Sequence, residues 1–117
     1  MEYAVSRDGT TLVTLHGGSE TTARDEAIDQ LAATFVDLED EGEITDWVIT
    51  DADVAEQPTA PFEPYTIGVA FAVTVVVEAD DRAEAMDRGA AAIEEALESA
   101  ALDGVTYAAG PDVAELE

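Results

Sequence analysis

The sequence lacks cysteine and lysine, and its four arginines and single histidine stand against 28 aspartates and glutamates. The absence of cysteine excludes a disulfide framework and a cysteine-ligated zinc site. Four arginines cannot neutralise a phosphate backbone, so we expect no binding to nucleic acid. No apolar run approaches the roughly 20 residues that a transmembrane helix needs, and no basic segment followed by an apolar one opens the chain. We therefore expect no membrane span and no conventional signal peptide.

The formal net charge of −24 is the dominant property of the chain. Acidic chains are often disordered, but 47% of these residues are hydrophobic and they recur with helix and strand periods. The carboxylates must therefore coat one folded domain. A carboxylate-rich surface without lysine resembles the proteins of salt-in halophilic archaea, because molar salt screens its self-repulsion. The alternatives are an acidic chaperone-like protein and an acidic mimic of DNA, although a mimic would gather its carboxylates on one face.

A strand–helix–strand unit occurs twice in the sequence. Val13 corresponds to Val75 and Phe35 to Leu97, which gives a constant offset of 62 residues. The first unit comprises a strand at 10–16, a helix at 20–40 and a strand at 44–50; the second comprises a strand at 72–78, a helix at 82–102 and a strand at 105–109. The periodicity of the apolar residues thus predicts an internal pseudo-repeat.

Each predicted helix has an apolar face and signals at both ends. The apolar positions are Ile28, Leu31, Phe35 and Leu38 in the first helix, and Met86, Ala90, Ile93, Leu97 and Ala100 in the second. Ser19 can cap the first helix, and Asp81 with Glu84 can form a capping box at the start of the second. Gly42 and Gly104 are expected to end the two helices, because glycine readily takes the left-handed conformation.

These elements predict an α+β fold that resembles the ferredoxin-like βαββαβ sandwich, with two helices on one face of an antiparallel sheet. Residues 1–117 form a single domain, with repeat halves at about 10–50 and 72–109. Residues 2–7 are predicted as an extra N-terminal edge strand, joined to the first core strand by a hairpin turn at Asp8-Gly9. Asp-Val-Ala-Glu occurs at 53–56 and 112–115, and we treat it as coincidence because its offset is 59.

The proline-rich connection at 51–64 is long for a compact domain. It is either a loop packed on the body or an arm that docks on a neighbouring subunit.

Residues 65–77 alternate over a length unusual for a strand, which must bend, with Gly68 the obvious place, or project past the sheet. Its even-numbered side is small and uncharged. That side suits packing between subunits, but it also suits the solvated face of an antiparallel sheet. The candidate interface residues are Ala70, Ala72, Thr74, Val76, Phe62 and Tyr65.

Signals for catalysis or ligand binding are weak. His16 has no second histidine and no nucleophile elbow to accompany it. The turn Gly17-Gly18-Ser19 is a candidate ligand site, although a tight turn capped by Ser19 also explains it. Residues 37–42 place carboxylates as a calcium loop does, but Val48 stands where the bidentate glutamate should be. We expect no catalytic residue, no cofactor and no specific metal site, only loose association of cations with the acidic surface.

The remaining features favour a non-enzymatic structural or assembly protein that forms homo-oligomers or joins a larger particle. Its setting would be the cytoplasm of a salt-in halophile or the virion of one of its viruses. The alternative is a small-molecule-binding regulatory domain, because ferredoxin-like dimers often bind ligands where helices meet the sheet.

Overall fold

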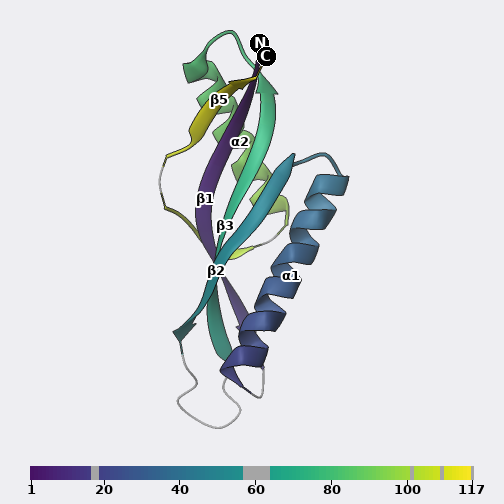
Figure 1. The fold of residues 1–117 in the computed structure, drawn as a ribbon, viewed down its shortest axis with the longest axis vertical. Coiled ribbons are helices and arrows are strands. Elements are labelled where there is room, and N and C mark those ends of the chain that lie inside the picture. The colour runs from purple at the N-terminus through teal and green to yellow at the C-terminus, as the bar shows by residue number, and fades with distance from the viewer. Residues whose placement is uncertain (17–18, 57–63, 101, 109, 117) are drawn as a thin grey trace.

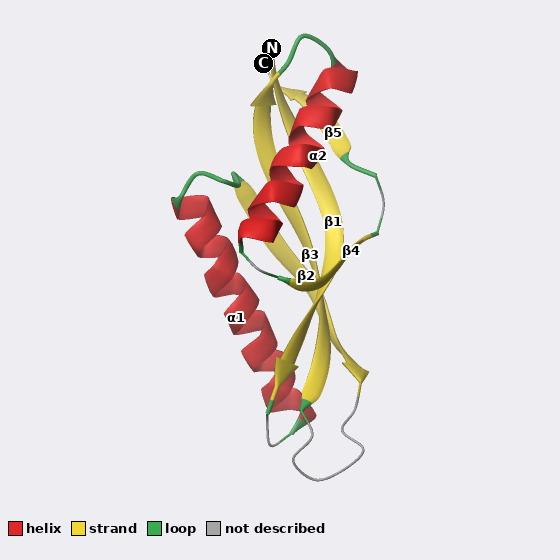
Figure 2. Cartoon of the chain, turned by 180° about the vertical axis from the view of Figure 1, so that it is seen from behind, coloured by secondary structure: helices red, strands yellow, loops and turns green. Residues whose placement is uncertain are grey.

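The computed structural model describes residues 1–16, 19–56, 64–100, 102–108 and 110–116. Two helices cover one face of a five-stranded antiparallel sheet, which makes the fold α+β (Figure 1, Figure 2). The elements are β1 (Glu2–Leu15), α1 (Glu20–Asp40), β2 (Asp46–Glu56), β3 (Tyr65–Glu78), α2 (Arg82–Ser99), β4 (Asp103–Tyr107) and β5 (Asp112–Leu116). The strand order is β2-β3-β1-β4, and β5 also pairs with β1. The molecule is elongated, with extents of 55 × 26 × 20 Å.

β1 is one continuous central strand. The predicted N-terminal edge strand and the predicted hairpin turn at Asp8-Gly9 are therefore wrong. Gly9 lies opposite Phe71, and a Cβ atom at this position would approach the Phe71 ring to 3.0 Å and the Thr106 carbonyl oxygen to 3.2 Å. A glycine inside a strand often marks such a close approach. The glycine makes room for a ring and does not form a turn.

β3 is the second central strand and pairs with β1 over its whole length without a register shift. It therefore continues through Gly68 and does not project past the sheet. β1 and β3 twist strongly, so that the strands cross in the view of Figure 2. The predicted alternation is present: the odd-numbered residues Ile67, Val69, Phe71, Val73 and Val75 are all buried.

β2 extends beyond its predicted end and continues to Glu56, so the first residues of the predicted 51–64 connection belong to a strand. The pairing with β3 shifts register between Ile49 and Asp51 and again between Val54 and Glu56. Such β-bulges insert one extra residue and let an edge strand bend with the sheet. Residues 57–63 lie outside the described residues.

α1 begins and ends where the sequence predicts. The Ser19 hydroxyl accepts a hydrogen bond from the Thr22 backbone N–H at 3.2 Å, which confirms the predicted cap. Asp81 caps α2 in the same way, accepting from the Glu84 backbone N–H at 2.8 Å. After α1, Gly42 has a φ of +79°, as predicted for a helix end.

α2 departs from its predicted end and from its predicted face. It stops at Ser99, and Gly104 lies in β4 instead of ending the helix. Met86 is exposed, whereas the buried positions are Ala85, Gly89, Ile93, Ala96 and Leu97. Small residues allow a helix to approach a sheet closely. The predicted face included Met86 and Ala90 and therefore overlooked their neighbours Ala85 and Gly89, which are the buried ones.

β5 is a strand that the sequence did not predict. It pairs with the first part of β1, so the additional strand of the sheet lies at the C-terminal end of the chain and not at the N-terminal end.

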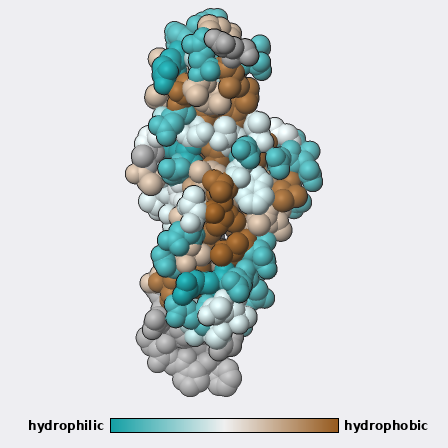
Figure 3. Space-filling view, in the orientation of Figure 1, coloured by the Kyte–Doolittle hydropathy of each residue, from teal (hydrophilic) through white to brown (hydrophobic). Residues whose placement is uncertain are grey.

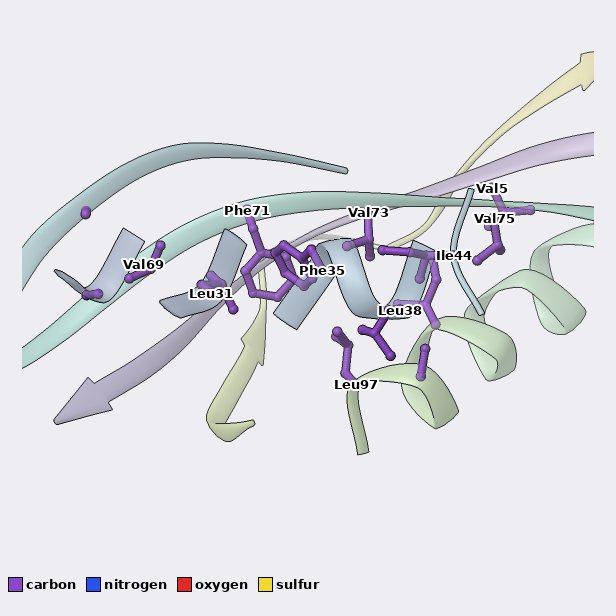
Figure 4. Packing of buried hydrophobic residues seen from close by; sticks show 14 of the residues in the cluster. Val5, Leu31, Phe35, Leu38, Ile44, Val69, Phe71, Val73, Val75 and Leu97 are labelled. Carbon is purple, nitrogen blue, oxygen red and sulfur yellow. The ribbon is translucent and has the colours of Figure 1, made fainter. Parts of the chain in front are cut away.

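The core lies between the helices and the odd-numbered side chains of β1 and β3 (Figure 4). Phe35 of α1 is at its centre, with ring-centroid distances of 5.2 Å to Phe71 and 5.6 Å to Trp47. Tilted ring pairs at this separation stabilise a core beyond their buried area. The helices therefore cover one face of the sheet and leave the other available.

Candidate functional site

The candidate site is the sheet face opposite the helices, called the open face from here on. In β3 it consists of the uncharged residues Thr66, Gly68, Ala70, Ala72, Thr74 and Val76. Leu12 and Val48 lie on the same face, because residues paired directly across an antiparallel sheet share a face and these two pair with Gly68 and Ala72.

The open face exposes apolar side chains. Val48 is 52% exposed, Leu12 is 39% exposed and Val76 is 36% exposed. Hydrophobic residues gather in a band along the middle of the view in Figure 3. In a protein with a net charge of −24, an uncharged band of this kind is the least expected part of the surface.

Aspartates lie on both sides of the uncharged β3 column. Asp46, Asp51 and Asp53 of β2 and Asp8 of β1 are exposed and lie opposite even-numbered residues of β3. These four residues form what we call the acidic rim. The open face thus has an apolar centre and a charged border, which is the anatomy of many protein interfaces.

The structure brings together four of the six predicted interface residues. Ala70, Ala72 and Thr74 are half-buried and Val76 is exposed, all on the open face. Thr74 is joined to Ser6 of β1 by a 2.8 Å hydroxyl–hydroxyl hydrogen bond. Tyr65 instead packs against the core on the helix side, and Phe62 lies outside the described residues.

Sequence reasoning missed Leu12 and Val48. Their place on the open face depends on the register of β1 and β2 against β3, and the hairpin predicted within β1 concealed that register. The alternation of β1 across Asp8-Gly9 was the signal that could have shown it.

The two edges of the sheet are poor sites for adding another strand. β2 carries two bulges and three aspartates on one edge. On the other edge, β4 ends at Tyr107 and β5 begins only at Asp112. Bulges, charges and short edge strands are the usual devices that prevent edge-to-edge pairing. The sheet therefore offers its open face more readily than its edges.

The predicted ligand turn is only partly described, since Gly17 and Gly18 lie outside the described residues. Ser19 uses its hydroxyl oxygen to cap α1, and His16 is exposed at the end of β1. Close to this turn, a depression of 390 Å³ lies between α1 and the first bulge of β2. Arg24 lines it and is one of the four cations of the chain.

A cluster on the helix side joins β1, β4 and α2. The Arg7 guanidinium lies 3.8 Å from the Tyr107 ring centroid, and its Nη1 is 3.2 Å from Glu94 Oε1. Burial, and secondly the charge of Glu94, raise the pKa of Tyr107 above the usual 10.0, against the opposing effect of Arg7. The cluster fastens β4 to the rest of the fold.

Among the described residues, no group of three or more histidine, aspartate or glutamate side chains is arranged to hold a metal ion. Neither described helix is long and apolar enough to cross a membrane. Comparison with protein-family models, curated proteins and solved structures gives no significant match to this chain.

Proposed function

We propose that the protein is a non-enzymatic structural or assembly protein that associates with further copies of itself through the open face. The observation that carries this proposal is the uncharged column of β3, flanked by exposed Leu12 and Val48, in a chain of net charge −24. Apolar surface of this kind is stabilised when a second surface excludes water from it.

The open face is suited to binding the open face of a second copy of the same chain. Two open faces stacked at the usual sheet spacing of about 10 Å would bring one apolar band against another. The aspartates of the edge strand β2 would then lie at the border of the contact, where solvent and salt can screen them. An isologous contact of this type gives a dimer, and dimers could then be incorporated into a larger particle.

We also infer a ferredoxin-like arrangement with an internal repeat. The strand order β2-β3-β1-β4 with two helices on one face is the order that a βαββαβ unit produces. The register supports the repeat: Asp53 pairs with Gly68 and Asp112 pairs with Ser6, and Gly68 follows Ser6 by the same offset of 62. The two Asp-Val-Ala-Glu segments would then occupy equivalent positions. Their offset of 59 equals the offset between the helix ends Asp40 and Ser99, because α2 has 18 residues and α1 has 21.

The charge supports a setting of high salt. Among the described residues, Arg7, Arg24 and Arg88 each form an ion pair with a glutamate. Because the sequence holds four arginines, no lysine and 28 carboxylates, most of these carboxylates have no cationic partner available. We propose the cytoplasm of a salt-in halophile, or a virion assembled there, as the place where such a surface is stable.

The test is the oligomeric state in molar KCl, measured by size-exclusion chromatography with light scattering. The wild-type chain should form a discrete dimer or larger oligomer. Val76→Glu and Val48→Glu should weaken association roughly 30-fold or more, because each places a carboxylate inside the contact. Val36→Glu is the matched control, since the exposure of Val36, 44%, lies between those of Val76 and Val48, and Val36 is on α1. A monomeric wild type, or identical oligomers in all variants, would contradict the proposal.

A further inference from the structure

One aspartate lies in the middle of the open face. On this face, positions 4–14 of β1 and 66–76 of β3 carry a single charged side chain, that of Asp8. The two strands pair along all 14 residues of each, and the pair Asp8–Ala72 is at the middle of their ladder. Asp8 is exposed, and its side chain forms no hydrogen bond or ion pair with the described residues. A contact between two open faces would therefore cover this carboxylate.

We propose that Asp8 makes association through the open face dependent on a small cation, so that each copy carries a cation such as K⁺ into the contact beside this carboxylate. The proposal rests on the self-association proposed above and names what regulates it. Burying an ionised carboxylate without a partner of opposite charge is costly. A contact that covers Asp8 therefore requires a positive charge from some source.

The open face of a second copy does not supply this positive charge. Three of the four arginines belong to α1 and α2, which cover the other face of the sheet (Figure 2). Arg7 precedes Asp8 in the chain, but its guanidinium lies over the Tyr107 ring and is paired with Glu94 of α2. Two identical open faces thus bring together two aspartates and no arginine. The compensating charge has to come from the solvent.

The surroundings of Asp8 favour a small cation. Ser6 and Thr10 are the next open-face residues on either side of it in β1, and the Ser6 and Thr74 hydroxyls are 2.8 Å apart. Hard cations prefer oxygen ligands, which the carboxylate and these hydroxyls provide. Asp112 of β5 pairs with Ser6 and is exposed on the same face, so it adds to the negative potential that attracts a cation.

The experiment compares association in KCl and in tetramethylammonium chloride at the same molar concentration, by light scattering over a dilution series. Both salts give the same Debye length, but the methyl groups of tetramethylammonium keep its charge away from oxygen ligands. The dissociation constant of the wild type should be about tenfold higher or more in tetramethylammonium chloride. Asp8→Asn should associate equally in both salts and at least as tightly as the wild type in KCl, because a carboxamide needs no compensating charge.

Asp53→Asn is the matched control, because Asp53 is also exposed on the open face but lies on the edge strand β2. This variant should keep the wild-type preference for KCl. Circular dichroism verifies that all three chains fold in both salts.

The outcomes separate this proposal from self-association itself. If the wild type associates equally in both salts, screening or protonation of Asp8 suffices, and the cation proposal fails while self-association stands. The same holds if Asp8→Asn keeps the preference for KCl, or if Asp8→Asn associates and the wild type stays monomeric in molar KCl. If no chain associates in either salt, self-association through the open face fails as well.

Discussion

Gly89 determines how closely α2 lies against β1. A Cβ atom built at this buried position would overlap the Val5 side chain, which is itself fully buried. Glycine inside a helix costs about 1 kcal/mol relative to alanine, so a glycine in the middle of α2 needs a compensating reason. The close approach of helix and strand provides that reason.

We predict that Gly89→Ala lowers the free energy of unfolding by about 1–3 kcal/mol, because overpacking outweighs the gain in helix propensity. Denaturant unfolding in molar KCl measures this change. Gly68→Ala is the control, since a Cβ atom there would meet no atom closer than 3.7 Å. Gly68→Ala should be close to neutral. A Gly89→Ala variant as stable as the wild type would show that α2 can move away from β1 without cost.

At the scale of elements, the Arg7–Tyr107–Glu94 cluster attaches the short strand β4 to β1 and α2. The raised pKa of Tyr107 means that the folded state holds the phenolic proton more tightly than the unfolded chain does. This contribution to stability is complete below pH 10, and it is lost as the pH rises above 10 through the folded-state pKa.

We therefore predict that the free energy of unfolding falls above about pH 10 and that Tyr107→Phe reduces this fall, because phenylalanine cannot ionise. Denaturant unfolding at a series of pH values from about 8 to 11 measures both chains. The quantity to compare at each pH is the difference in free energy of unfolding between the wild type and Tyr107→Phe. Ionisation of the other groups affects both proteins and cancels in this difference. Parallel curves would mean that Tyr107 does not contribute to the alkaline loss.

Elements with a strong periodicity could be predicted from the sequence, and elements defined by their partners could not. α1, both N-terminal caps and the alternation of β3 follow from local spacing. β1 was divided because Asp8-Gly9 favours a turn when only neighbours in the chain are considered, and the reason for Gly9 is the Phe71 ring on another strand. β5 has no strong pattern of its own, and its pairing with β1 is what makes it a strand.

The residues of the candidate site likewise fall into those that the sequence could predict and those that it could not. Ala70, Ala72, Thr74 and Val76 follow from alternation within one strand. Leu12 and Val48 require the register between strands, and the Arg24 depression requires knowing that α1 lies beside the β2 bulge. Each of these is a long-range relationship, which a single sequence does not contain.

At the scale of the whole molecule, electrostatic self-repulsion opposes both folding and association. The Debye length falls from about 30 Å in 0.01 M salt to about 3 Å in 1 M salt. The first distance is comparable to the extents of 26 and 20 Å across the molecule, so in dilute buffer nearly all of its carboxylates repel one another. In molar salt only adjacent carboxylates do.

We predict that the thermal unfolding temperature rises steeply between dilute buffer and molar KCl, because screening removes repulsion from a surface with 28 carboxylates and four arginines. Circular dichroism at increasing KCl concentration measures it. Sucrose is the control: it stabilises folded proteins by exclusion from their surface but does not screen charge, so it should not replace KCl. Changing exposed Glu26, Asp29 and Asp37 to their amides should reduce the dependence on KCl. A flat salt profile, or equal stabilisation by sucrose, would contradict the halophilic assignment and leave the open face as the remaining support for an assembly role.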